Sequence, residues 1–139
     1  MAAERLFEMR LAARPDRLRL LRCTLRDAAS LAGLASDEVE RVVLAANEAC
    51  MNIIQHAYKD QADGEVVVEA IDNDVDLELR FIDFAPPINA SACRPRDLGD
   101  VRPGGLGTHF MQEVMDEVRY SRLEADDGNC LVMKKYKNK

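Results

Sequence analysis

The stretch from Glu38 to Lys59 constrains the fold most, because it requires a long helix with one buried face. Its apolar residues recur at the three- and four-residue spacing of an amphipathic helix. They are Val39, Val42, Val43, Ala46, Cys50, Ile53 and Ala57. Ser36 is expected to be the N-cap, and Asp37 suits the positive end of the helix dipole. The stretch therefore predicts a helix that packs against the core of the domain.

A second stripe on the same helix is polar. Glu48, Asn52 and His56 follow one another at four-residue intervals, so they stack on one helix face. Ala45 and Ala49 lie between the two stripes and are expected to leave these groups room to reach a ligand. A carboxylate, an amide and an imidazole at the edge of a buried face indicate a site. A solvated helix face is the alternative.

Length and charge limit the classes of protein that the chain can represent. Its 139 residues suit a single domain, 1–139, with its own hydrophobic core. A formal net charge of −6 argues against direct nucleic-acid binding. We find neither a signal peptide nor an apolar run of membrane-spanning length in the sequence. We therefore expect a cytoplasmic protein without membrane association.

Cysteines, histidines and arginines give weaker signals. The four cysteines form no C-x-x-C pair and are expected to be reduced packing residues: Cys23, Cys50, Cys93 and Cys130. His56 and His109 lack a plausible third ligand for a metal-histidine site. Arginines dominate the N-terminal region, at positions 5, 10, 14, 17, 19, 22 and 26. They are either solvated or form a docking surface for an acidic protein.

The remaining elements follow from periodicity and turn residues. An edge strand is expected over Arg5–Ala13, then a helix that starts at Pro15 and ends at the C-cap glycine Gly33. Two segments, Glu65–Ile71 and Val75–Ile82, predict an antiparallel hairpin with one face under the helices. The closing strands are expected over Val118–Leu123 and Cys130–Tyr136.

Two stretches after the hairpin carry candidate binding groups. Asp83 ends the second strand, and residues 88–103 form a long aperiodic segment that is either a functional lid or a connector. A glycine-rich segment, 104–107, then opens a helix whose apolar stripe runs from Leu106 to Val118. Glycines at a helix start let a ligand approach the free N–H groups, which is how such helices bind phosphate.

These three stretches together resemble a known family. The sequences E-A-C-M-N-I-I-Q-H-A-Y, D-F-A-P-P-I and G-G-L-G-T-H-F-M-Q-E-V-M-D-E-V-R-Y resemble the N, G1 and G2 boxes of the anti-sigma factor serine/threonine kinases, the RsbW-type family. This family belongs to the superfamily of gyrase-type and histidine-kinase ATPases. The resemblance covers nearly the whole chain. It implies an α/β (α+β) two-layer sandwich, in which helices cover one face of a mixed, mainly antiparallel sheet and ATP is held between helix and lid.

The resemblance also implies roles for individual residues. Asn52 corresponds to the Mg²⁺ ligand, Glu48 to the carboxylate that orients and deprotonates the attacking hydroxyl, and Asp83 to the group that accepts from the adenine amino group. The segment expected at the triphosphate comprises Gly104, Gly105, Leu106, Gly107 and Thr108. Ala85 departs from the family, whose G1 box carries glycine there. His56 is expected to pack or hydrogen bond at the site edge.

The implied function is that of an ATP- and Mg²⁺-dependent serine/threonine protein kinase that is also an anti-sigma factor. Its implied partners are a sigma factor, a STAS-type anti-anti-sigma protein that it phosphorylates, and a second copy of the chain in a homodimer. The alternative is a nucleotide-binding module that sequesters its partner without transferring phosphate. A histidine kinase is a third possibility, but the chain has no room for a dimerisation helix pair that carries a phosphoacceptor histidine.

Overall fold

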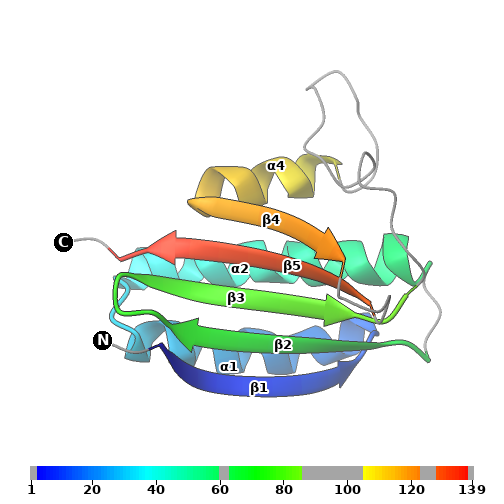
Figure 1. The fold of residues 1–139 in the computed structure, drawn as a ribbon, viewed down its shortest axis with the longest axis horizontal. Coiled ribbons are helices and arrows are strands. Elements are labelled where there is room, and N and C mark those ends of the chain that lie inside the picture. Colours follow the sequence, from blue (N-terminus) through cyan, green and yellow to red (C-terminus); the bar gives the residue numbers. More distant parts are fainter. Residues whose placement is uncertain (1–2, 60–62, 86–104, 123–127, 138–139) are drawn as a thin grey trace.

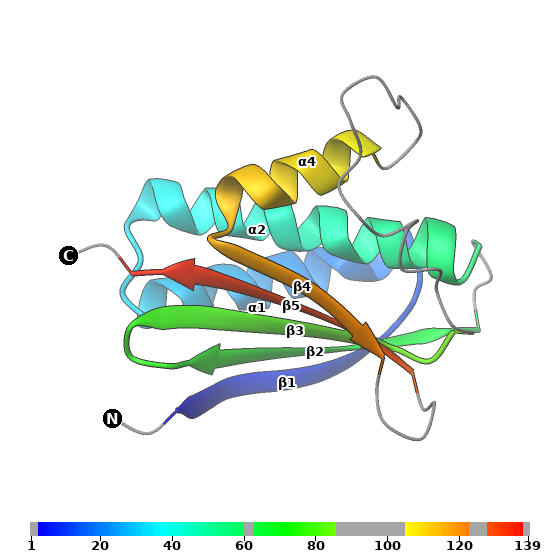
Figure 2. The same ribbon diagram turned by 45° about the horizontal axis from the view of Figure 1, so that its top comes forward.

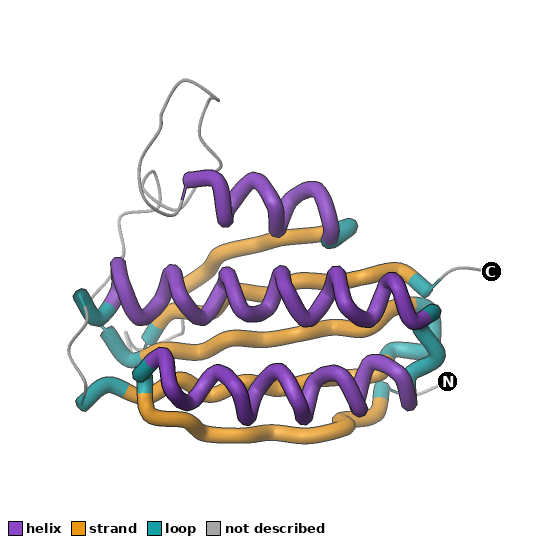
Figure 3. Tube along the Cα trace, turned by 180° about the vertical axis from the view of Figure 1, so that it is seen from behind, coloured by secondary structure: helices purple, strands orange, loops and turns teal. Residues whose placement is uncertain are grey.

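Helices cover one face of a five-stranded sheet in a computed structural model, which describes residues 3–59, 63–85, 105–122 and 128–137 (Figure 1). The strands lie in the order β1 (Glu4–Ala12), β2 (Glu65–Asp72), β3 (Asp76–Asp83), β5 (Asn129–Tyr136) and β4 (Glu117–Arg122), and each described pair is antiparallel. Seen from behind, the three long helices lie on the same side of this sheet (Figure 3). The predicted two-layer α+β sandwich is therefore confirmed.

The first three strands follow the predicted pattern. Strand β1 (Glu4–Ala12) lies at the edge of the sheet and pairs with β2 (Glu65–Asp72), with one register shift between Arg5 and Phe7. Strand β3 (Asp76–Asp83) pairs with β2 to complete the predicted hairpin. Asp74, in the turn, has a φ of 74°.

The first two long helices are joined by a glycine. A 3₁₀ turn, η1 (Pro15–Arg17), leads into α1 (Leu18–Leu31). Gly33 then takes a φ of 101°, which favours glycine, and donates to Ser30 O at 3.0 Å. Helix α2 (Ser36–Asn52) follows, but Ser36 is its first helical residue and no side chain caps it. The predicted serine N-cap is therefore wrong.

The final elements close the sheet on its second edge. Helix α4 (Gly105–Val114) leads into β4 (Glu117–Arg122), which pairs with β5 (Asn129–Tyr136). The helix ends earlier than its predicted apolar stripe, so Val118 lies in β4. Strand β5 also pairs with β3, which places the closing hairpin beside the strand that ends in Asp83.

The core lies between the sheet and the helices. Leu77, Leu79 and Phe81 alternate along β3 and are fully buried, because they point toward the helical layer. Leu21 and Leu25 of α1 are also fully buried in the same cluster. Helix α2 packs between α1 and α4 and contributes its predicted apolar stripe to this core.

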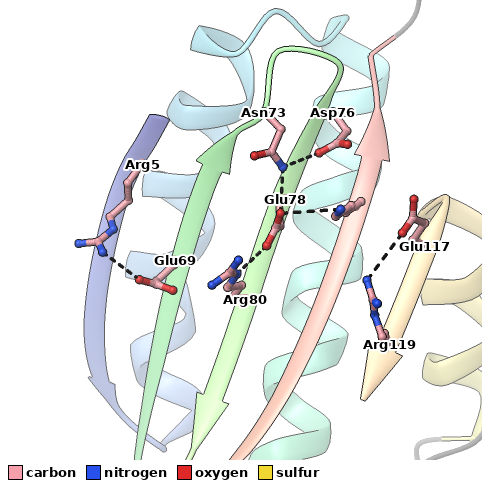
Figure 4. Close-up of polar contacts among 9 residues, drawn as sticks. Arg5, Glu69, Asn73, Asp76, Glu78, Arg80, Glu117 and Arg119 are labelled. Atoms are coloured by element: carbon pink, nitrogen blue, oxygen red, sulfur yellow. Dashed lines mark hydrogen bonds and ion pairs between the residues drawn. The ribbon is translucent and has the colours of Figure 1, made fainter. Parts of the chain in front are cut away.

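The opposite face of the sheet is charged and internally paired (Figure 4). Glu78 pairs with Arg80 on the same strand and also accepts from Asn73 at 2.9 Å. Arg5 lies 3.4 Å from Glu69 on the neighbouring strand. These contacts compensate the buried carboxylates, so this face needs no helical cover.

Some surface expectations need correction. Cys50 is buried, and burial raises the pKa of its thiol to about 12, but Cys23 is exposed and does not pack in the core. Among the arginines, Arg22 donates to Asn47 at 2.9 Å and Arg26 binds Glu40 through two hydrogen bonds. These contacts join α1 to α2. Cys93 lies outside the described residues.

No helix in the described part of the chain combines the length and the hydropathy needed to cross a bilayer.

Candidate functional site

Helix α2 carries the first two candidate residues on one face. Glu48 and Asn52 are one helical turn apart and half-buried. In the described part of the chain, neither side chain has a hydrogen bond or an ion pair. A half-buried carboxylate and amide without protein partners can both bind a ligand. Ala45 and Ala49, predicted to leave these two groups room, are fully buried in the core.

His56 lies in a π-helical turn that follows these two residues. The α-helical pattern ends at Asn52, and η2 (Ile53–Ala57) closes with a hydrogen bond from Tyr58 N to Ile53 O at 3.0 Å. Hydrogen bonds between residues five apart make a wider turn than an α-helix, and such turns are frequent at functional sites. The predicted stack of three polar residues is therefore interrupted, and His56 is exposed.

Asp83 lies at the end of β3 and is 2% exposed. Burial raises the pKa of its carboxyl group, while hydrogen bonds from Asn129 and from the Ala85 amide oppose that rise. Both donors bind the same oxygen, Oδ1, at 2.8 Å and 3.1 Å. No described residue donates to the other oxygen, Oδ2, so it can accept a hydrogen bond from a ligand.

The backbone at Ala85 does not need a glycine. Among described non-glycine residues, only Lys59 and Asp74 have a positive φ, so Ala85 adopts a conformation open to any residue. Ala85 is 3% exposed, and its carbonyl accepts from Asn129 Nδ2 at 3.4 Å. The departure from the family pattern therefore introduces no backbone strain.

Tyr58 connects the end of η2 to the strands. Its hydroxyl donates to Glu65 O at 2.6 Å and accepts from Phe84 N at 2.8 Å. Its ring fills the space in front of Gly64, where an added Cβ would lie 2.6 Å from the ring. Tyr58 therefore holds the segment after Asp83 against the end of the helix that carries Asn52.

Three residues of this site were not predicted from the sequence: Tyr58, Asn129 and Arg122. The predicted closing strand begins at Cys130, yet Asn129 is the first residue of β5 and lies opposite both Asp83 and Arg122. The aspartate-glycine-asparagine turn sequence predicts a hairpin, but it does not show which strand the hairpin will pair with. That pairing brings Asn129 to Asp83.

Helix α4 contributes its N-terminal end. Gly105, Leu106, Gly107 and Thr108 form its first turn, whose N–H groups have no partner within the helix. Gly104 and residues 88–103 lie outside the described residues. The start of α4, the end of α2 and the end of β3 lie at the same end of the sandwich (Figures 1 and 2). The segments that carry the candidate groups therefore end or begin at one end of the sandwich.

Comparison with known proteins identifies a family and its relatives. The family described as "Histidine kinase-like ATPase domain" matches residues 11–135. The chain is 34% identical over 145 residues to the serine-protein kinase RsbW of Bacillus pumilus, covering 96% of this chain and 87% of that protein. It is 33% identical over 138 residues to the RsbW of Listeria monocytogenes, covering 94% and 86%.

Solved structures share the fold. A crystal structure of the RsbU and RsbW domains of a Mycobacterium tuberculosis protein has a TM-score of 0.63 at 17% identity, covering 98% of this chain. A blue-light activated histidine kinase of Erythrobacter litoralis has a TM-score of 0.56 at 20% identity, covering 74% of this chain. The chain spans about a third of each of these longer proteins, 32% and 31%.

Family membership follows from the sequence match together with the fold. The matched range includes Glu48, Asn52, Asp83 and all of α4. The identity to the RsbW proteins extends over nearly the full length of both chains. The chain therefore belongs to the histidine kinase-like ATPase domain family and, within it, to the RsbW family of serine-protein kinases.

Proposed function

We propose that this chain is an ATP- and Mg²⁺-dependent serine/threonine protein kinase that also acts as an anti-sigma factor. Its protein substrate is a STAS-type anti-anti-sigma protein. The observation that carries this proposal is the placement of Glu48, Asn52, Asp83 and the start of α4 at one end of the sandwich. The names of the related serine-protein kinases support the same activity.

Asp83 binds the adenine base in this proposal. Its Oδ2 accepts a hydrogen bond from the adenine amino group, while Oδ1 stays bonded to Asn129 and to the Ala85 amide. The carboxylate lies in a nearly dry site, where a hydrogen bond to a charged group contributes strongly to binding.

The phosphates lie between α2 and α4. The free N–H groups in the first turn of α4, including those of Gly105 and Gly107, donate to phosphate oxygens. Asn52 supplies an amide oxygen, a ligand that suits Mg²⁺ together with phosphate oxygens and water. The residues present fit the ion, because Asn52 is half-buried and has no partner among the described residues. When bound, Mg²⁺ neutralises phosphate charge.

Glu48 acts on the protein substrate. It accepts the proton of the serine or threonine hydroxyl as that oxygen forms its bond to the γ-phosphorus of ATP. The bond between the γ-phosphorus and the bridging oxygen breaks, and ADP leaves with the electron pair. Glu48 suits this role because it is one helical turn from Asn52 and has no protein partner among the described residues.

The regulatory partners follow from the same proposal. The chain binds a sigma factor as a homodimer and releases it when the anti-anti-sigma protein binds in its place. A protein that sequesters a sigma factor acts where transcription takes place, which is the cytoplasm. On α1, Arg22 and Arg26 already bind α2, so Arg19 is the exposed arginine of this helix for an external partner.

Substitution of Asp83 by asparagine tests the nucleotide site. We expect Asp83→Asn to weaken ATP binding by about 1.5–3 kcal/mol, measured by calorimetry, because the charged acceptor is lost.

Burial raises the pKa of Asp83, so the folded state binds its proton more tightly than the unfolded state does. Stability from this group therefore falls as pH rises through the raised pKa, and the ionised form opposes folding at neutral pH.

The thermal stability of the Asp83→Asn variant provides a control for folding. Because Asp83→Asn removes a buried charge, its thermal stability at neutral pH should not fall below that of the wild type. Unchanged ATP affinity in this folded variant would remove Asp83 from the nucleotide site.

A further inference from the structure

Asp83, Asn129 and Arg122 lie in one row across three neighbouring strands. Asn129 is opposite Asp83 on β3 and opposite Arg122 on β4. Directly opposed residues point to the same face, and Asp83 shares the buried face of Phe81. The row therefore lies under the helical layer, where β3 and β4 end and β5 begins (Figure 2).

Arg122 fixes the orientation of the Asn129 amide. Its Nη1 donates to Asn129 Oδ1 at 2.9 Å, and a guanidinium group can only donate. The amide oxygen must therefore face Arg122, and the amide nitrogen faces the other way. There Nδ2 donates to Asp83 Oδ1 at 2.8 Å and to Ala85 O at 3.4 Å.

This orientation determines what Asp83 can offer a ligand. Oδ1 is occupied by two donors, which leaves Oδ2 to accept from outside. The hydrogen bond from Asn129, the bond from the Ala85 amide and the positive charge of Arg122 all favour the ionised form against burial. An ionised carboxylate only accepts hydrogen bonds, whereas a protonated one can also donate.

The other titratable groups around Asp83 do not replace these donors. Tyr58, at the end of η2, has its phenol pKa raised by burial and also by the Asp83 charge. Cys130, next to Asn129 on β5, has its thiol pKa raised by burial, with a smaller contribution from the same charge. Both groups therefore stay neutral near neutral pH, and among the described residues Arg122 is the cation whose charge acts on the carboxylate.

We propose that Asn129, held by Arg122, is a positioning residue that makes the site select a 6-amino purine over a 6-oxo purine. The inference rests on the proposed function, because it takes Asp83 as the group that contacts the base. An acceptor-only carboxylate pairs with an amino donor and repels an oxo oxygen. If the carboxyl group became protonated, it could donate to the oxo group, and the selectivity would fall.

The test compares the affinities of ATP and inosine triphosphate, which differ at C6, where an oxo acceptor replaces the amino donor, and at N1, which carries a proton in inosine. We expect wild type to prefer ATP, and Asn129→Leu to lower the ratio of the two affinities about tenfold or more. As the pH is lowered, the variant should also lose its preference for ATP at a higher pH than wild type does, because Asp83 protonates more readily without the hydrogen bond from Asn129. Calorimetric titrations across the mildly acidic to neutral range measure both effects.

A second variant and two controls complete the design. Arg122→Met leaves the Asn129 amide in place but removes the bond that orients it, so the ratio should fall in the same direction. If Asn129→Leu does not fold, Arg122→Met alone tests the role of Asn129. Arg119→Met is the control for Arg122, because it removes an exposed arginine from the same strand, β4. Asn73→Leu is the control for Asn129, because it removes an asparagine that donates to two carboxylates at the other end of the sheet. Both controls should keep the wild-type ratio.

The outcomes distinguish a failure of the proposed kinase function from a failure of the inferred role of Asn129. A wild type that does not bind ATP removes the proposed function and this inference together. If wild type prefers ATP and both variants keep its ratio and pH profile, the inference alone is wrong. A parallel loss of affinity for both nucleotides, with no shift in the pH profile, would show a structural role and would also overturn it.

Discussion

Glu48→Gln is expected to keep ATP binding and to slow phosphate transfer to the protein substrate about 100- to 10,000-fold, the usual contribution of a general base. Glutamine has nearly the same shape as glutamate but cannot accept the hydroxyl proton. Glu48 has no hydrogen bond or ion pair among the described residues, so its replacement should disturb the fold little. Single-turnover transfer from labelled ATP, with calorimetry for binding, measures both properties.

Glu40 provides a matched control for this prediction. It lies on the same helix, two turns earlier, and its exposed carboxylate pairs with Arg26. Glu40→Gln therefore makes the same chemical change away from the site and should leave the transfer rate unchanged. If Glu48→Gln transferred phosphate as fast as wild type, Glu48 would not be the base.

Leu21→Ala is expected to lower the free energy of unfolding by about 2–5 kcal/mol, because it opens a cavity in the core. Leu21 is fully buried in α1, while its neighbour Leu20 is 54% exposed. Leu20→Ala, the matched control, should change stability by about 0.5 kcal/mol or less. Urea unfolding of both variants tests whether the helical layer packs on the sheet as described. Equal effects in the two variants would contradict that packing.

Most helices and strands were predictable from the sequence because their signals are local. Alternation along β3 identified the buried face, and Gly33 marked the end of the first helix, because the positive φ that it takes there favours glycine. The apolar stripe of α2 identified the helix that packs on the core. Each of these signals depends on residues close together in the chain, so periodicity and turn chemistry predicted the elements, while the family resemblance implied their assembly into a two-layer sandwich.

The site was predictable only in part, since some of its contacts depend on strand pairing. Glu48, Asn52 and Asp83 belong to short motifs, and the motifs identified them as candidates. The contact between Asn129 and Asp83 joins residues 46 positions apart and exists only because β5 pairs with β3. The π-helical turn at Ile53–Ala57 also has no signal in the hydrophobic pattern, so the displacement of His56 was missed.

The most direct test of the kinase proposal is phosphate transfer to the cognate anti-anti-sigma protein. The purified chain is incubated with ATP labelled at the γ-phosphate and that protein, and the phosphorylated amino acid is then identified. We predict label on a serine or threonine of the partner, dependent on Mg²⁺ and on Glu48. A chain that binds ATP and a sigma factor but labels no partner would be a sequestering module without kinase activity, which would contradict the account.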